Sequence, residues 1–161
     1  MKKLLNTLFV AMVVLLTSAA HAQDQKAIDD KILQEYFAKN HIKATKTPSG
    51  LYYTIIKKGS GENAKRKQTV SMNYLGKLLN GTRFDGNIDE NFKPTPGRTP
   101  FNFTLGIGQV IQGWDEGVQL LNKGSRATLY LPSHLGYGPS GTGPIPPNAI
   151  LIFDVEMLDN H

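Results

Sequence analysis

The sequence predicts an α+β domain in which a five-stranded antiparallel sheet half-wraps one short helix, preceded by a helical arm. Five short segments between residues 51 and 158 are rich in β-branched and aromatic residues and alternate apolar with polar side chains. One segment with a helical period lies between the third and the fourth of them. Turn residues separate the segments, which favours antiparallel neighbours over parallel βαβ units.

The first 22 residues are predicted to be a signal peptide. Lys2 and Lys3 form a basic start, Leu8 to Leu16 is apolar, and Ala20-His21-Ala22 has the small-x-small form of a cleavage site. The apolar run is shorter than the roughly 20 residues that span a bilayer. We therefore expect export to the periplasm, or secretion into the medium, with no membrane anchor after cleavage.

Composition excludes several classes of function. The chain has no cysteine, so disulfides, thiolate metal sites, cysteine catalysis and a lipid anchor on cysteine are excluded. The formal net charge is +5, and Lys2 and Lys3 supply two of these charges. The one dense basic run, Lys65-Arg66-Lys67, follows a Gly-rich turn and is typical of a solvated loop. We expect no nucleic-acid partner.

The segment from Asp24 to about Asn40 is predicted to be a helix capped by Asp24. Its apolar residues at helical spacing are Ile28, Ile32, Leu33, Tyr36 and Phe37. This face either packs on its own domain or contacts a second copy in a dimer. Ala44 to Gly50, rich in Thr, Pro and Ser, indicates a linker. Residues 23–46 are thus the helix and linker, and residues 47–161 are the main domain.

The five strands follow in order after the linker. The first is ended by Gly59-Ser60-Gly61, and Asn80-Gly81 closes the second. Their expected ranges are Leu51–Lys58, Thr69–Leu79, Pro100–Leu105, Arg126–Leu131 and Ile150–Leu158.

The short helix carries the only tryptophan of the chain. Trp114, Val118 and Leu121 share one face, while Lys123 and Gly124 supply a cation and a stop for the end of the helix. Trp114 follows closely on two β-branched residues, Val110 and Ile111. The pattern predicts either an ordinary core helix or a helix whose tryptophan forms the floor of a pocket.

Three motif matches fail. Asp85, Asn87 and Asp89 have the spacing of a calcium loop, but Glu90 replaces its glycine and Pro96 its final glutamate. The run Gly106-Ile107-Gly108 lacks the third glycine and the βαβ unit of a dinucleotide site. His134 has no serine in a Gly-x-Ser-x-Gly turn to activate. We expect no metal and no cofactor.

Aromatic residues are spread over all parts of the domain. They are accompanied by a glycine- and proline-rich loop from Gly141 to Pro147, which a plain core does not require. A loop stiffened by proline and made close-fitting by glycine suits the rim of an apolar cleft. The aromatic set consists of Tyr74, Phe84, Phe101, Phe103, Trp114, Tyr137 and Phe153.

Six motifs in order resemble the FKBP-type peptidyl-prolyl cis-trans isomerases, the tacrolimus-binding family. The resemblance covers about Gly50 to Leu158. The motifs are Tyr-x-Gly at 74–76, Gly-Thr-x-Phe-Asp at 81–85, Pro-Phe-x-Phe-x-Leu-Gly at 100–106, Val-Ile-x-Gly-Trp-Asp-Glu-Gly at 110–117, Tyr-Gly at 137–138 and Ile-Pro-Pro-Asn-Ala-x-Leu-x-Phe-Asp-Val-Glu at 145–156.

The resemblance implies an FKBP-like fold and a set of site residues. Trp114 would form the pocket floor, the Tyr137 hydroxyl would meet a substrate carbonyl, and Asp85 would accept a hydrogen bond at the edge. The implied catalytic residues are Tyr74, Phe84, Asp85, Trp114, Tyr137 and Phe153, and the implied substrate-binding residues are Phe101, Val110, Ile111 and Ile145. The chain departs from short family members by extra residues between Asp85 and Phe101 and by Pro144.

The implied function is rotation of Xaa-Pro bonds in unfolded or partly folded exported proteins, without a cofactor. Tacrolimus and rapamycin are the implied inhibitors. The alternative from another class is a chaperone or binding module that holds proline-containing segments without turnover. The helix from Asp24 to Asn40 lies outside the resemblance, so we expect it to be dispensable for chemistry.

Overall fold

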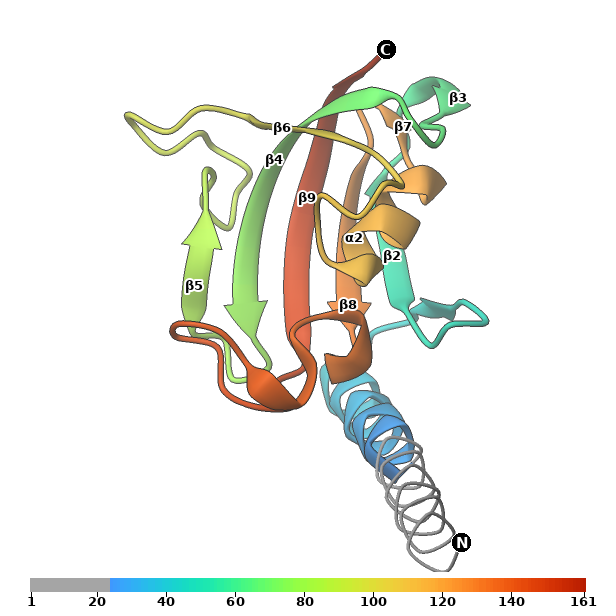
Figure 1. Ribbon diagram of the computed structural model, residues 1–161, viewed down its shortest axis with the longest axis vertical. Helices are drawn as coiled ribbons and strands as arrows, with labels where there is room; N and C mark the ends of the chain where they lie inside the picture. The colour runs from blue at the N-terminus through green and yellow to red at the C-terminus, as the bar shows by residue number, and fades with distance from the viewer. Residues whose placement is uncertain (1–23) are drawn as a thin grey trace, which may run out of the picture.

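The computed structural model describes residues 24–161 (Figure 1). The predicted signal peptide and its cleavage site lie outside these residues. Within the described range, no helix combines the length and the apolar character needed to cross a membrane.

One antiparallel sheet forms the body of the protein. Its strand order is β1-β2-β8-β9-β4-β5. The strand β6 pairs with the same edge of β4 as β5 does: β5 pairs with residues 75–77 of β4, and β6 pairs with residues 69–72. The strands are β1 (Thr45–Lys46), β2 (Tyr52–Lys57), β4 (Thr69–Leu78), β5 (Arg83–Gly86), β6 (Phe101–Thr104), β8 (Arg126–Leu131) and β9 (Leu151–Asn160). A separate pair joins β3 (Ser60–Asn63) to β7 (Asn122–Lys123).

All five predicted strands are present, as β2, β4, β6, β8 and β9. The sequence did not reveal β1, β3, β5 and β7, because each has at most one large apolar side chain and so shows no apolar alternation. Two expectations are corrected as a result. The linker contains β1, and Lys123 lies in β7 rather than in the last turn of the helix.

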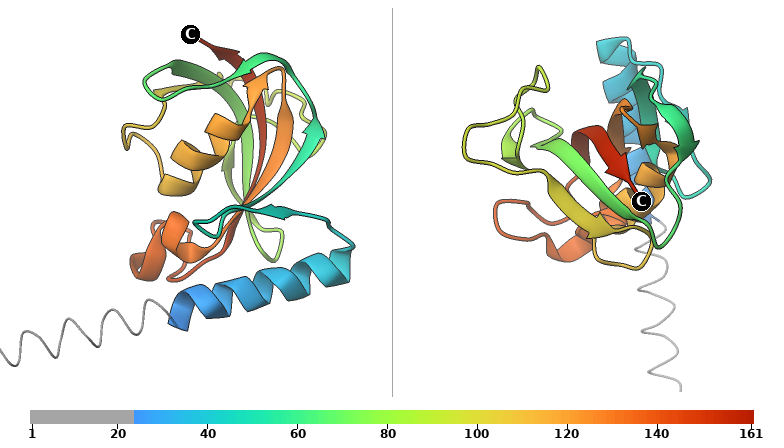
Figure 2. Two further views of the ribbon diagram at one scale, coloured as in Figure 1. Left: turned by 90° about the vertical axis from the view of Figure 1, so that its right-hand side faces the viewer. Right: turned by 90° about the horizontal axis from the view of Figure 1, so that it is seen from above.

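The short helix lies across the hollow side of the curved sheet (Figures 1 and 2). It consists of α2 (Gln112–Gly117) and the 3₁₀ turn η1 (Val118–Leu120). Gly113 allows α2 to approach β8 closely, since a Cβ atom there would lie 2.4 Å from Leu131 Cδ2. Trp114, Val118 and Leu121 are buried on the face toward the sheet, as predicted.

The N-terminal helix packs on the opposite face of the sheet. Residues 24–40 are helical, and Leu33 and Phe37 are buried against Tyr52, Tyr130 and Ile152. The Phe37 ring lies edge-on to Tyr52 and Tyr130, with ring centroids 5.0 Å and 4.9 Å away. Figure 2 shows this helix crossing one end of the sheet. Packing on its own domain is therefore confirmed for Leu33 and Phe37.

The predicted apolar face is wrong in part. Ile28 and Ile32 are 50% and 36% exposed, while Asp29 is buried in line with Leu33 and Phe37. A helical period places these residues on neighbouring faces, and it cannot show which face the sheet covers.

The close approach at Gly113 gives a stability prediction. Gly113→Ala is expected to destabilise the protein by about 1–3 kcal/mol, because the new methyl group overpacks the contact with Leu131. Urea unfolding would measure the change. The control is Gln112→Ala on the exposed side of α2, which should change stability by about 0.5 kcal/mol or less. If Gly113→Ala leaves the free energy of unfolding unchanged, α2 shifts freely on β8.

Candidate functional site

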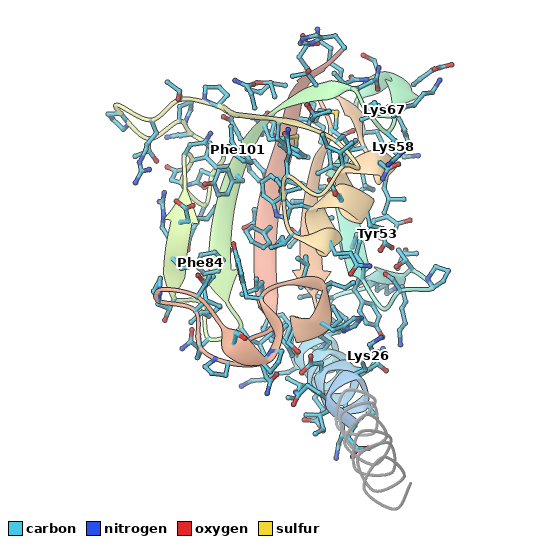
Figure 3. All side chains as sticks on the ribbon, viewed as in Figure 1. Lys26, Tyr53, Lys58, Lys67, Phe84 and Phe101 are labelled. Atoms are coloured by element: carbon cyan, nitrogen blue, oxygen red, sulfur yellow. The ribbon has the colours of Figure 1, made fainter. Side chains whose placement is uncertain are left out.

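A cavity of about 470 Å³ opens on the hollow side of the sheet, beside α2. Every predicted site residue except Ile145 lines it; Ile145 is buried in the core, and Gln109 joins the lining. Figure 3 shows Phe84 beside β5 and Phe101 near β6. The lining residues are Tyr74, Phe84, Asp85, Phe101, Gln109, Val110, Ile111, Trp114, Tyr137 and Phe153.

Trp114 is held in place by the edges of neighbouring rings. Tyr74 and Phe153 meet it nearly perpendicularly, at 87° and 85°, with centroids 5.3 Å and 5.4 Å away. Such edge-to-face contacts fix ring orientation as well as burying apolar area. The indole is only 4% exposed, and its buried N–H has no hydrogen-bond partner within residues 24–161. The ring therefore lies buried among apolar aromatic side chains.

One wall depends on the glycine of the Tyr-x-Gly motif. A Cβ atom at Gly76 would lie 2.6 Å from Phe84 Cε2 and 2.9 Å from Phe153 Cε1. Because Gly76 has no Cβ atom, the rings of Phe84 and Phe153 pack edge to face over β4, with centroids 5.6 Å apart. The packing of these two rings thus requires the glycine of the Tyr-x-Gly motif, which the sequence alone did not reveal.

Tyr74 and Asp85 form the fixed polar pair of the cavity. The Tyr74 hydroxyl donates to Asp85 Oδ2 at 2.7 Å, and Asp85 Oδ1 accepts from the Gly86 N–H at 2.8 Å. Burial, and then the nearby Asp85 carboxylate, raise the pKa of Tyr74 well above its ordinary value. Tyr74 therefore stays neutral near pH 7 and keeps donating to Asp85.

Tyr137 lies at the mouth of the cavity, before the 3₁₀ turn η3 (Gly138–Ser140). Its side chain is 39% exposed, and its hydroxyl makes no hydrogen bond to any other described residue. Burial and the charge of Asp85 raise its pKa, so the hydroxyl is a neutral donor near pH 7. This hydroxyl is free to donate to a bound group.

The rim beside α2 is fixed by the Asp115 carboxylate. Its two oxygens accept from the N–H groups of Gly106 and Gly108, each at 2.8 Å. Gln109 Oε1 accepts from the Thr104 N–H at 2.7 Å, which orients the stem of Gln109 at the rim. Sequence reasoning missed Gln109, because a single polar residue in a turn carries no periodic signal.

The failed calcium pattern has a structural role at Asn87. Its Oδ1 accepts from the Tyr74 N–H at 2.7 Å, and its Nδ2 donates to Thr99 O at 3.0 Å. Asn87 thereby ties the insertion between Asp85 and Phe101 to β4. Across residues 24–161 there is no group of three or more His, Cys, Asp or Glu side chains placed to hold a metal ion.

Residues 60–158 match the family described as FKBP-type peptidyl-prolyl cis-trans isomerase. The chain is 43% identical over 138 residues to "FKBP-type peptidyl-prolyl cis-trans isomerase FkpA" of Aeromonas hydrophila, covering 84% of this chain and 48% of that protein. It is also 43% identical over 110 residues to "FK506-binding protein" of Neisseria meningitidis serogroup B, covering 68% of this chain and 94% of that protein.

The crystal structure of FkpA from Escherichia coli has a similar fold. It superposes with a TM-score of 0.68 at 32% sequence identity, covering 97% of this chain and 71% of that one. The chain therefore spans about half the length of the Aeromonas relative and most of the Neisseria one.

Proposed function

The chain belongs to the FKBP-type peptidyl-prolyl cis-trans isomerase family, and we propose that it accelerates rotation about Xaa-Pro bonds in exported proteins and so assists their folding. The observation that carries the proposal is the cavity itself. Aromatic edges hold Trp114 as an apolar floor, and a free tyrosine hydroxyl lies at the mouth. The volume of the cavity suits a prolyl ring with a flanking residue.

The reaction needs an environment rather than a reactive group. Rotation about the planar amide faces a barrier of about 18–20 kcal/mol, because resonance is lost as the bond twists. The twisted amide carries less charge on its carbonyl oxygen than the planar one. A dry apolar cavity disfavours the planar ground state more than the twisted state, and this difference lowers the barrier.

The side chains have distinct proposed roles. Trp114 supports the prolyl ring, while Phe84, Phe101, Val110, Ile111 and Phe153 exclude water from it. Tyr137 donates to a carbonyl of the bound chain. The bond from Tyr74 keeps the Asp85 carboxylate at the edge, away from the apolar floor.

A second candidate function is a chaperone that holds proline-containing segments without turnover. It is favoured by two exposed side chains that line the cavity, Phe101 and Tyr137. Both candidates use the same cavity, so only a measured rate separates them.

Proline-exchange NMR on a short Xaa-Pro peptide tests the proposal. We expect the protein to increase the cis-trans exchange rate, and tacrolimus or rapamycin to abolish the increase, since their pipecolyl ring mimics proline. Trp114→Ala should lose more activity than Trp114→Leu, because the floor acts through shape and exclusion of water. Peptide binding without accelerated exchange would establish the holding function instead.

The role of Tyr137 gives a graded prediction. If its hydroxyl only donates a hydrogen bond, Tyr137→Phe costs about 0.5–1.5 kcal/mol, which is roughly tenfold or less in rate. The pKa values of Tyr74 and Tyr137 are raised from their ordinary values, so both hydroxyls stay neutral near pH 7 and the rate should be flat from about pH 6 to 8. A hundredfold loss, or a bell-shaped pH profile, would indicate acid-base catalysis.

Export is proposed from the amino-terminal pattern. We expect cleavage after Ala22, which leaves Gln23 as the first residue. Mass spectrometry of protein recovered from the periplasm or the medium would measure this end. A chain that still carries Met1 to Ala22 would contradict the export proposal.

We also propose that the N-terminal helix contacts a second copy through Ile28 and Ile32, which its own domain leaves exposed. Replacing both with serine should convert a dimer into a monomer in sedimentation velocity experiments. Lys26→Ser, exposed on the other side of this helix, is the control and should leave the dimer intact. A monomeric wild-type protein would contradict the proposal.

A further inference from the structure

A buried carboxylate joins the N-terminal helix to the loop that carries Tyr137. Asp29 is 1% exposed, and its Oδ2 accepts from both the N–H and the Oγ–H of Ser133, at 2.8 Å and 2.6 Å. Its Oδ1 accepts from Gln25 Nε2 at 2.8 Å. A buried carboxylate is stable only with such partners, so these bonds fix the two segments relative to each other.

Ser133 stands four residues before Tyr137, at the start of the 3₁₀ turn η2 (Ser133–Leu135). This turn is closed by bonds from Leu135 N to Pro132 O and from Gly136 N to Ser133 O, at 2.9 Å and 3.0 Å. Figure 2 shows the N-terminal helix running beneath the loop that continues from β8. A displacement of Ser133 is therefore passed to Tyr137 through a short, internally bonded stretch of backbone.

We propose that Asp29 is a positioning residue, which fixes Ser133 and thereby places the Tyr137 hydroxyl at the cavity mouth. The inference rests on the proposed function, in which Tyr137 donates to bound substrate. It reverses the expectation that the N-terminal helix is dispensable for chemistry. The helix contributes no atom to the cavity lining and acts on the site through this one polar junction.

The neighbouring residue Asp30 provides a matched control. Its Oδ1 accepts from the Tyr52 hydroxyl at 2.7 Å and pairs with Lys46 Nζ, which joins the same helix to β1 and β2. Neither of these contacts of Asp30 involves Ser133. Loss of its charge therefore weakens the docking of the helix but leaves the junction to the Tyr137 loop in place.

The test compares exchange catalysis by variants of the whole protein. Asp29→Ala should lower kcat/KM by about three- to tenfold, bounded by the loss in Tyr137→Phe, because it acts through that hydroxyl. Asp29→Asn should recover most of the activity, since its amide oxygen can accept both bonds from Ser133. Asp30→Asn should stay within about twofold of the wild type.

A double variant distinguishes positioning from general damage. In the Tyr137→Phe background, Asp29→Ala should cause no further loss, because the group that it positions is already absent. Equal losses in both backgrounds, or full activity in a folded Asp29→Ala, would overturn the proposal. Should Asp29→Ala not fold, Ser133→Ala removes one of the two bonds and must show the same dependence on Tyr137.

A structural readout separates this inference from the proposed function. The ring resonances of Tyr137 in NMR spectra should shift in Asp29→Ala and Ser133→Ala but not in Asp30→Asn. Unshifted resonances in both Asp29→Ala and Ser133→Ala would overturn the positioning role. If the wild-type protein catalyses no exchange, the proposed function fails, while the ring shifts still decide whether Asp29 positions Tyr137.

Discussion

The close contact between α2 and β8 determines where the cavity lies. Without side chains at Gly113 and Gly117, the helix rests directly on Leu131 and Leu129. The helix therefore covers the β8 side of the hollow face and leaves the side formed by β9, β4 and β6 open. The Trp114 ring and the aromatic side chains of those strands line this open part, so that an apolar hollow remains where a larger helix contact would have filled the space.

Most polar groups around the hollow are engaged with the protein itself. Tyr74 donates to Asp85, Asp115 accepts from the rim backbone, and Asn87 bonds the insertion to β4. Bonds of this kind keep polar atoms from competing for a bound carbonyl, and they rigidify the walls. The exceptions among the aromatic side chains of the cavity are the buried Trp114 N–H on the floor and the Tyr137 hydroxyl at the mouth. The proposed rotation of Xaa-Pro bonds suits such a site, because it requires no proton transfer.

Local alternation of apolar and polar residues predicted five of the strands, and the resemblance to the FKBP family supplied the proposed site residues. Period-two alternation located β2, β4, β6, β8 and β9, and the aromatic motifs named nearly all of the cavity lining. Ile145 lay beyond such reasoning. Its loop closes on itself through two backbone bonds between Thr142 and Ile145, and its buried side chain belongs to the core and is absent from the cavity lining. Such closure depends on loop geometry that no periodicity encodes.

The N-terminal helix shows why the kind of contact matters as much as its size. Leu33 and Phe37 belong to an apolar cluster on the face of the sheet opposite the cavity, and apolar contacts carry little directional information. A buried carboxylate differs, because its two bonds to Ser133 hold only in a narrow range of distance and angle. Asp29, in an otherwise apolar stripe of the helix, therefore fixes the position of Ser133 relative to the helix. A leucine in the same place could not do this.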